Sequence, residues 1–150
     1  MATKIPAQSP LHFQHSESTK APAAAIWAIW IDIDRWPEWD RGLKKAQLKN
    51  GPFAEGAKGR LTPDKGPKAK FIITDVKEGQ AYTLKTRIPF GWLIVRRYLK
   101  EEKDQRVFTH EVEFTGLFKK LFARQLGKRY QKMLPEVLQK IKELAEQVPG

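Results

Sequence analysis

Cysteine is missing from this sequence of 150 residues. Its absence excludes disulfides, thiolate metal sites and thiol nucleophiles, so the hydrophobic core must hold the fold together unaided. Histidine is scarce, and the three histidines at positions 12, 15 and 110 argue against a histidine metal centre. We therefore predict no metal site. The lack of cysteine also fits a reducing compartment, and we expect a cytoplasmic protein.

Long apolar segments and nucleotide-binding glycine motifs are missing as well. The longest apolar run, residues 21–33, is interrupted by Pro22 and Asp32 and is too short to cross a bilayer. Residues 1–6 lack the apolar run that follows the charge in a signal peptide. Because no Walker or dinucleotide-binding motif occurs, we expect a soluble protein that uses no cofactor.

What the sequence does contain is enough apolar residues for one core. They make up 41% of the chain, and 150 residues is the size of one domain rather than two. Residues 1–10 include two prolines and show little periodicity, which predicts a loose tail. Residues 11–150 are expected to form a single domain.

The order of periodic segments predicts a mixed fold of strands and helices. Alternation from Leu11 indicates a strand, Pro22 begins a helix, and Arg35 to Asp40 forms a second short helix limited by Pro37. Short connections between the strands that follow imply an antiparallel meander. These strands are predicted at residues 43–49, 57–61, 68–76, 80–88, 92–103 and 106–115.

A long amphipathic helix is predicted from Leu117 onwards, with Pro135 inside it as a kink or a break. With its apolar stripe it is expected to cover the apolar face of the sheet. The stripe consists of residues three or four positions apart: Phe118, Phe122, Leu126, Tyr130, Met133, Val137, Ile141, Leu144 and Val148.

One segment resembles a known superfamily. Residues 21–32, APAAAIWAIWID, are followed by Trp36-Pro37-Glu38-Trp39. This opening resembles the START-like or Bet v 1-like (SRPBCC) superfamily, and especially its polyketide cyclase/dehydrase-type branch. The resemblance implies an α+β helix-grip fold, in which a curved antiparallel sheet of about seven strands wraps around the C-terminal helix. It also implies a cavity between the two.

The function implied by the resemblance is the binding or carriage of a small hydrophobic molecule, such as a lipid, a polyketide or an aromatic metabolite. The alternative is a cyclase, dehydratase or hydrolase that uses the same cavity. No catalytic set of the superfamily is matched residue by residue. The predicted cavity residues are Tyr82, Leu84, Arg96, Phe108, His110, Val112, Phe114, Leu126, Tyr130 and Met133.

Three polar residues are candidates for chemistry in that cavity. His110 shares an apolar strand face and is the candidate acid or base, unless it is a core histidine bonded to a neighbour. Arg96 and Arg97 point to opposite faces, so one of them leans inward, where it needs a carboxylate of the protein or of a ligand. Tyr130 either closes the cavity with its hydroxyl or packs in the core.

The aromatic residues have two possible roles. Trp27, Trp30, Trp36 and Trp39 either lock the short helices onto the sheet, which we favour, or form a wall for a ligand. The hairpin tip before Trp92, Pro89-Phe90-Gly91, is either a packed turn or an exposed aromatic tip that gates the cavity or touches a membrane.

Charge is unevenly distributed, with a formal net value of +11. No acidic residue occurs between Leu117 and Pro135. The simplest interpretation is the solvated outer face of a helix, and the functional alternative is a module that docks on an anionic membrane or on a protein. Nucleic acid is disfavoured because no recognition motif accompanies the charge. The basic residues of this surface recur every four positions: Lys120, Arg124, Lys128 and Lys132.

Overall fold

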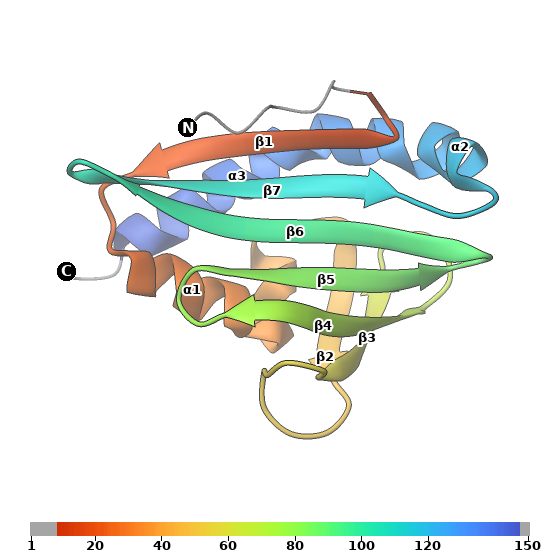
Figure 1. Ribbon diagram of the computed structural model, residues 1–150, viewed down its shortest axis with the longest axis horizontal. Coiled ribbons are helices and arrows are strands. Elements are labelled where there is room, and N and C mark those ends of the chain that lie inside the picture. Colours follow the sequence, from red (N-terminus) through yellow and green to blue (C-terminus); the bar gives the residue numbers. More distant parts are fainter. Residues whose placement is uncertain (1–8, 148–150) are drawn as a thin grey trace.

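Seven antiparallel strands form one sheet in the computed structural model, which describes residues 9–147 (Figure 1). Most of the predicted tail, together with Val148, lies outside the described residues. The order across the sheet is β1-β7-β6-β5-β4-β3-β2, so the first strand closes against the last. The predicted meander is confirmed. The strands are β1 (His12–Thr19), β2 (Leu43–Leu48), β3 (Lys58–Pro63), β4 (Ala69–Lys77), β5 (Ala81–Ile88), β6 (Gly91–Glu102) and β7 (Gln105–Phe114).

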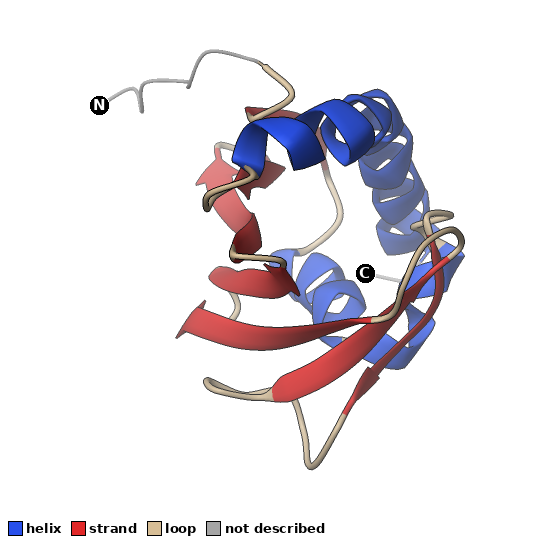
Figure 2. Ribbon diagram, turned by 90° about the vertical axis from the view of Figure 1, so that its right-hand side faces the viewer, coloured by secondary structure: helices blue, strands red, loops and turns tan. Residues whose placement is uncertain are grey.

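Strand periodicity places one face of the sheet in the core. On β7 the alternate residues Phe108, His110, Val112 and Phe114 are all buried, as side chains two positions apart must share a face. The sheet curls around the helices, which lie on its concave side (Figure 2). The predicted helix-grip architecture is therefore confirmed. None of the helices in residues 9–147 is long and apolar enough to span a membrane.

Two short helices follow β1, namely α1 (Ala23–Ile31) and the 3-10 helix η1 (Ile33–Glu38). Trp30 and Trp36 are fully buried, and the Trp36 indole Nε1 donates to the carbonyl oxygen of Trp30 at 3.0 Å. This bond ties η1 to the end of α1. The packing role that we favoured for these tryptophans agrees with this arrangement.

The C-terminal helix departs from the prediction in one respect. It consists of α2 (Lys119–Phe122), a π-helical turn η2 (Ala123–Gly127) and α3 (Lys128–Gln147). Of the two alternatives at Pro135, a kink or a break, the break does not occur, because α3 runs through it. Pro135 is exposed, so the carbonyl group four residues earlier can turn to water instead of losing a buried partner.

The π-helical turn changes which residues face the sheet. A π turn accommodates one more residue than an α turn, so the side chains after it are rotated about the helix axis. Ala123 and Gly127 are consequently buried, whereas Leu126 is exposed. Gly127 allows the close approach, since a Cβ atom there would lie 2.3 Å from the Pro10 carbonyl oxygen.

Candidate functional site

The sheet and α3 enclose a cavity of about 70 Å³. Its walls come from the concave faces of β5, β6 and β7, from η1 and β2, and from α3. Most of the lining is aliphatic or aromatic. The polar side chains that reach it are Asp40, Thr86, Arg97, His110 and Tyr130. An apolar cavity with a few convergent polar groups is the usual form of a small-molecule site.

A second pocket of about 450 Å³ adjoins the inner cavity. Leu43, Leu61, Tyr130 and Met133 line both spaces. The outer pocket lies between the β3–β4 turn, the end of β5 and the beginning of the C-terminal helix. Tyr130 and Met133, on the C-terminal helix, therefore border both the inner cavity and the outer pocket.

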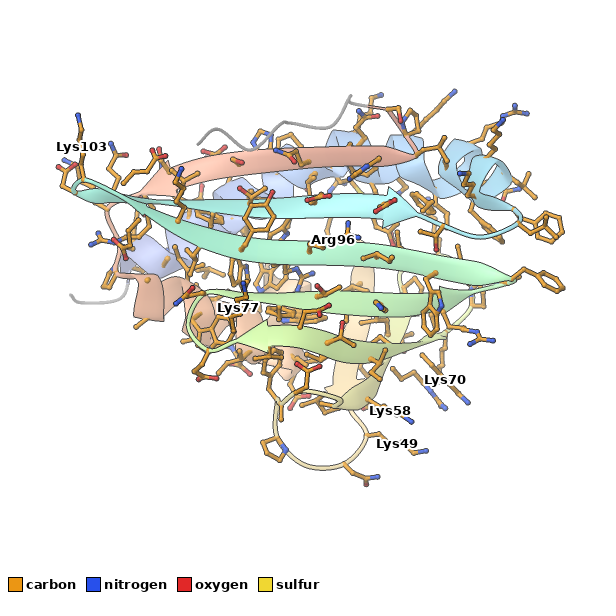
Figure 3. All side chains as sticks on the ribbon, viewed as in Figure 1. Lys49, Lys58, Lys70, Lys77, Arg96 and Lys103 are labelled. Atoms are coloured by element: carbon orange, nitrogen blue, oxygen red, sulfur yellow. The ribbon has the colours of Figure 1, made fainter. Side chains whose placement is uncertain are left out.

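Arg97, rather than Arg96, is the arginine that points inward. Arg97 is 5% exposed and lines the cavity, so the assignment of Arg96 to the cavity was wrong. Arg96 lies on the outer face of β6 (Figure 3), where its Nη1 atom binds Glu111 at 3.2 Å and Glu113 at 2.9 Å. The reason is strand alternation, because neighbouring residues on a strand face opposite sides.

Aromatic rings surround the Arg97 guanidinium. Its central carbon lies 4.5 Å from the ring centroid of Trp36, 5.1 Å from that of Trp39 and 5.7 Å from that of Tyr82. Its Nη1 atom donates to the Tyr82 hydroxyl at 2.6 Å. The Tyr82 hydroxyl in turn donates to the Trp30 carbonyl oxygen at 3.2 Å. Cation–π contacts of this kind position a guanidinium without neutralising its charge.

The charge of Arg97 has no carboxylate partner within residues 9–147. Its Nε atom is buried and has no hydrogen-bond partner in that range either. Asp40 is the acidic group that lines the same cavity, but the two side chains do not form an ion pair. A buried cation without a directly paired anion is costly, which makes this position a candidate for binding an acceptor group of a ligand.

His110 lies beside Arg97, its cross-strand partner in the β6–β7 register. The His110 Nε2 atom accepts a hydrogen bond from the Trp30 indole at 3.0 Å, so the neutral ring carries its proton on Nδ1. Burial, followed by the charges of Arg97 and His15, lowers the pKa of His110 well below 6.5. The ring is therefore neutral at physiological pH and is a weak base.

Asp40 and Tyr130 complete the polar lining. The Asp40 Oδ1 atom accepts the Gly42 amide at 2.9 Å. Burial raises the pKa of Asp40, and the Gly42 hydrogen bond and the Arg97 charge oppose this shift. Burial and the negative charge of Asp40 raise the pKa of Tyr130 to about 12. Tyr130 therefore keeps its hydroxyl proton at neutral pH and can donate a hydrogen bond.

The predicted cavity residues fall into three groups. Those that line the inner cavity are Leu84, His110, Val112, Tyr130 and Met133. Three others, Tyr82, Phe108 and Phe114, are buried in the core without lining it.

The last group consists of two residues. Arg96 lies on the outer face of the sheet. Leu126 lines the outer pocket, so the assignment of Leu126 to the inner cavity was wrong, and the π-helical turn that contains this residue is the reason.

The sequence did hold a signal for Arg97. Pro89 and Phe90 form a two-residue turn that pairs Ile88 with Gly91, and the same register pairs Tyr82 with Arg97. Directly opposed residues of an antiparallel pair share a face. The turn length therefore places Arg97 on the apolar face with Tyr82. No comparable signal marks Asp40, which depends on how η1 packs against the sheet.

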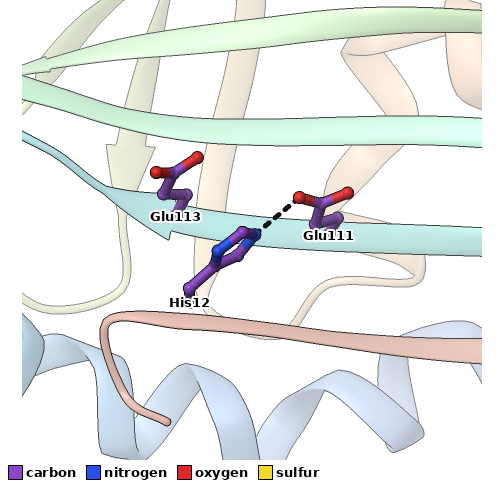
Figure 4. Close-up of side chains that lie close together, drawn as sticks. All are labelled: His12, Glu111 and Glu113. Atoms are coloured by element: carbon purple, nitrogen blue, oxygen red, sulfur yellow. Dashed lines mark hydrogen bonds and ion pairs between the residues drawn. The ribbon is translucent and has the colours of Figure 1, made fainter. Parts of the chain in front are cut away.

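A separate cluster of titratable groups lies on the outer face of the sheet. His12, Glu111 and Glu113 place their ligand atoms within 4.8 Å of one another (Figure 4). The His12 Nε2 atom binds Glu111 at 2.6 Å, and Arg96 binds both glutamates. Arg96 already neutralises the negative charge that these carboxylates would offer to a metal ion. The cluster is thus a surface ion-pair network.

The curled sheet, the long helix and the cavity between them define a helix-grip protein of the START-like or Bet v 1-like type. The family model described as "Polyketide cyclase / dehydrase and lipid transport" matches residues 10–146. The chain belongs to this family. No curated protein matches the sequence.

Solved structures agree with this fold. Protein MLL2253 from Mesorhizobium loti has a TM-score of 0.73 at 13% identity, covering 93% of this chain and 99% of that chain. Norcoclaurine synthase from Thalictrum flavum, in complex with dopamine and hydroxybenzaldehyde, has a TM-score of 0.69 at 15% identity, with 93% and 88% covered.

A third similar structure is the di-domain ARO/CYC StfQ from the steffimycin biosynthetic pathway. It has a TM-score of 0.71 at 13% identity, and the match covers 91% of this chain but 51% of StfQ. At these identities the likeness shows the fold alone.

Proposed function

We propose that this protein binds and carries a small hydrophobic molecule that has an anionic oxygen, and that Arg97 binds this oxygen. The observation that carries the proposal is the buried guanidinium of Arg97, which faces an apolar cavity without a carboxylate partner within residues 9–147. An aromatic carboxylate meets both requirements, since its ring is apolar and its head group neutralises the charge.

The size of the two spaces supports a small ligand. The inner cavity accommodates only the head group in the present positions of Tyr130 and Met133, and the outer pocket takes the apolar remainder. Met133 is a flexible side chain that repacks readily, so it can move aside as a ligand enters. Tyr130 can then donate a hydrogen bond from its hydroxyl group to the same ligand.

The experiment that tests this proposal compares two ligands of the same shape. Naphthoate carries a carboxylate, and naphthamide is its neutral analogue. Isothermal titration is expected to show that naphthoate binds at least about tenfold more tightly, because only the anion neutralises Arg97. Equal affinities would refute the role of Arg97. Carriage would be refuted if neither compound binds and the purified protein releases no apolar species.

A second candidate function is catalysis in the same cavity. The observation in its favour is that His110 and Arg97 line one space, where an arginine can polarise a carbonyl. His110 can accept the neighbouring proton only after its Nε2 atom gives up the hydrogen bond from the Trp30 indole. Its lowered pKa makes His110 a weak base, so we rank carriage first.

The test of catalysis is proton exchange at the carbon next to the carbonyl of an aryl ketone, followed by NMR in deuterated water. Acceleration by the protein that is lost in His110→Ala would support an enzyme, and no acceleration would count against it.

A cytoplasmic location, which the sequence predicts, is part of the proposal that this protein is a carrier.

A further inference from the structure

Large apolar side chains are exposed at one end of the molecule. Phe90 is 73% exposed and Leu117 is 76% exposed, and Phe118 and Leu121, which follow Leu117 in the chain, are exposed as well. They belong to the β5–β6 turn, the β7–α2 connection and α2, which lie at the same end in Figure 1. We call Phe90, Leu117, Phe118 and Leu121 the apolar tip. Exposed apolar residues that gather in this way mark an interaction surface.

The backbone holds this tip in one shape. The Leu117 amide donates to the Phe90 carbonyl oxygen at 3.2 Å, and the Phe90 and Phe118 rings meet edge to face at 5.4 Å between centroids. Gly91 and Gly116 allow the two segments to touch, since a Cβ atom on Gly91 would lie 2.1 Å from the Thr115 carbonyl oxygen. The two turns therefore present their apolar side chains as one surface.

Phe90 is an unusual residue for its position. Its φ angle is 60°, at the second central position of a turn whose first central residue is Pro89. This arrangement strongly favours glycine or asparagine there, because a large side chain is strained at positive φ. A bulky aromatic residue thus lies in a strained conformation that makes its ring protrude. Strain of this kind, at a solvent-exposed apolar residue, points to a function for the ring.

Positive charge surrounds the tip. No acidic residue occurs from position 114 to position 135, and Lys119, Lys120 and Arg124 are exposed beside the apolar residues. Within residues 9–147 none of these three forms an ion pair with a carboxylate. Apolar side chains flanked by unpaired cations match the chemistry of an anionic bilayer surface, where acyl chains lie beneath phosphate and carboxylate groups.

We propose that the protein docks on anionic membranes through the apolar tip, with Phe90 and Leu117 inserted among the lipids and Lys119, Lys120 and Arg124 on the head groups. The outer pocket ends at Pro89 and at Phe122, next to the tip. Docking in this orientation brings the mouth of that pocket to the lipid surface. The proposal does not depend on what the inner cavity binds, because the tip lies outside it.

The experiment is sedimentation of the full chain with vesicles of phosphatidylcholine and phosphatidylserine in equal parts. Phe90→Gly is expected to weaken binding about tenfold through the loss of inserted apolar area. Glycine accepts positive φ, so this variant should keep its melting temperature, and Phe90→Trp should retain binding because indole rings favour the interface. Parent-like binding by Phe90→Gly would overturn the proposal.

The charge arm uses two triple variants with the same change in net charge. Lys119→Glu, Lys120→Glu and Arg124→Glu together should reduce binding about a hundredfold. The control reverses three lysines that line a groove on the β2–β4 edge of the sheet (Figure 3) and should bind like the parent: Lys49→Glu, Lys58→Glu and Lys70→Glu.

Two results of this arm would contradict membrane docking. Equal losses in both triple variants would show that the net charge alone drives binding. The second result has two parts: the tip triple variant loses binding to a single-stranded oligonucleotide as well, and Phe90→Gly leaves vesicle binding intact. Together these would assign the surface to a nucleic acid instead.

Discussion

The proposed function rests on the buried charge of Arg97, and Arg97→Met removes this charge while keeping an unbranched, flexible side chain. The matched control is Arg96→Met, one residue earlier on the same strand. It makes the same change in net charge on the outer face, where Arg96 pairs with Glu111 and Glu113. The two variants make the same chemical change on opposite faces of the sheet, and Arg96→Met additionally breaks two ion pairs at the surface.

The expected effect of Arg97→Met on stability is small, because opposing contributions nearly cancel. The variant loses the charged hydrogen bond to Tyr82, worth about 1.5–3 kcal/mol, and aromatic contacts worth about 0.5–2 kcal/mol. It also removes the desolvation cost of a buried cation, which is several kcal/mol. Tyr82 keeps its bond to the Trp30 carbonyl oxygen, so no buried hydroxyl is left unsatisfied. We expect a net change within about 2 kcal/mol of zero.

The effect on ligand binding is expected to be large. Removing one partner of a buried charge pair typically costs about 2–5 kcal/mol, which corresponds to a loss of affinity of roughly 30-fold or more. Isothermal titration with naphthoate measures this loss, and urea unfolding of the free protein measures stability. Arg96→Met should bind naphthoate like the parent.

Two outcomes would refute this reasoning. If Arg97→Met binds naphthoate like the parent, Arg97 does not hold the head group of the ligand. If Arg97→Met instead lowers the free energy of unfolding by much more than about 2 kcal/mol, Arg97 makes stabilising interactions beyond the contacts seen in the cavity.

Three further changes test the fold and the site. Below pH 6.5 position 110 binds a proton in the unfolded chain, whereas the buried His110 ring of the folded protein stays neutral. The free energy of unfolding should therefore fall by up to about 1.4 kcal/mol per pH unit as the pH decreases below this value. His110→Gln should reduce that slope in urea titrations. Leu138→Ala, at a fully buried site, should lower the free energy of unfolding by about 2–5 kcal/mol, whereas Leu126→Ala, at an exposed site, should lower it by under about 1 kcal/mol. Similar losses of stability in the two variants would contradict the helix register. Gly127→Ala should lower the free energy of unfolding by about 1–3 kcal/mol, because its Cβ would meet the Pro10 carbonyl oxygen, and an unchanged value would mean that the helix can shift.

Local patterns were sufficient to predict most of the architecture. The period of two along the strand segments and the short turns between them predicted every strand within a few residues. The Trp36-Pro37-Glu38-Trp39 segment predicted the short helix that follows α1. Each of these features depends on neighbours in the chain, so it is visible in a single sequence.

The helix register was not predictable in the same way. The apolar spacing through Leu126 suits an uninterrupted α-helix, and it gives no sign of the π-helical turn. That turn accompanies the contact between Gly127 and Pro10, two residues far apart in the sequence. Tertiary packing thus overrides the local period and moves Leu126 out of the core.

By itself, the sequence determined the order of strands and helices, the inward face of β7 with His110, and the basic stretch without acids that follows Gly116, whereas the helix-grip fold was implied by the resemblance of residues 21–39 to a known superfamily. These depend on periodicity and composition, which are local properties of the chain. Only the tertiary structure decided that Arg97 meets Trp36, Trp39 and Tyr82 without a carboxylate partner among the described residues, and that Asp40 reaches the same cavity. It also decided that Phe90 and Phe118 join into one exposed tip. The physical reason is the same in each case: these groups come from separate elements, and their contacts exist only once the sheet has curled around α3 and the strands have paired in register.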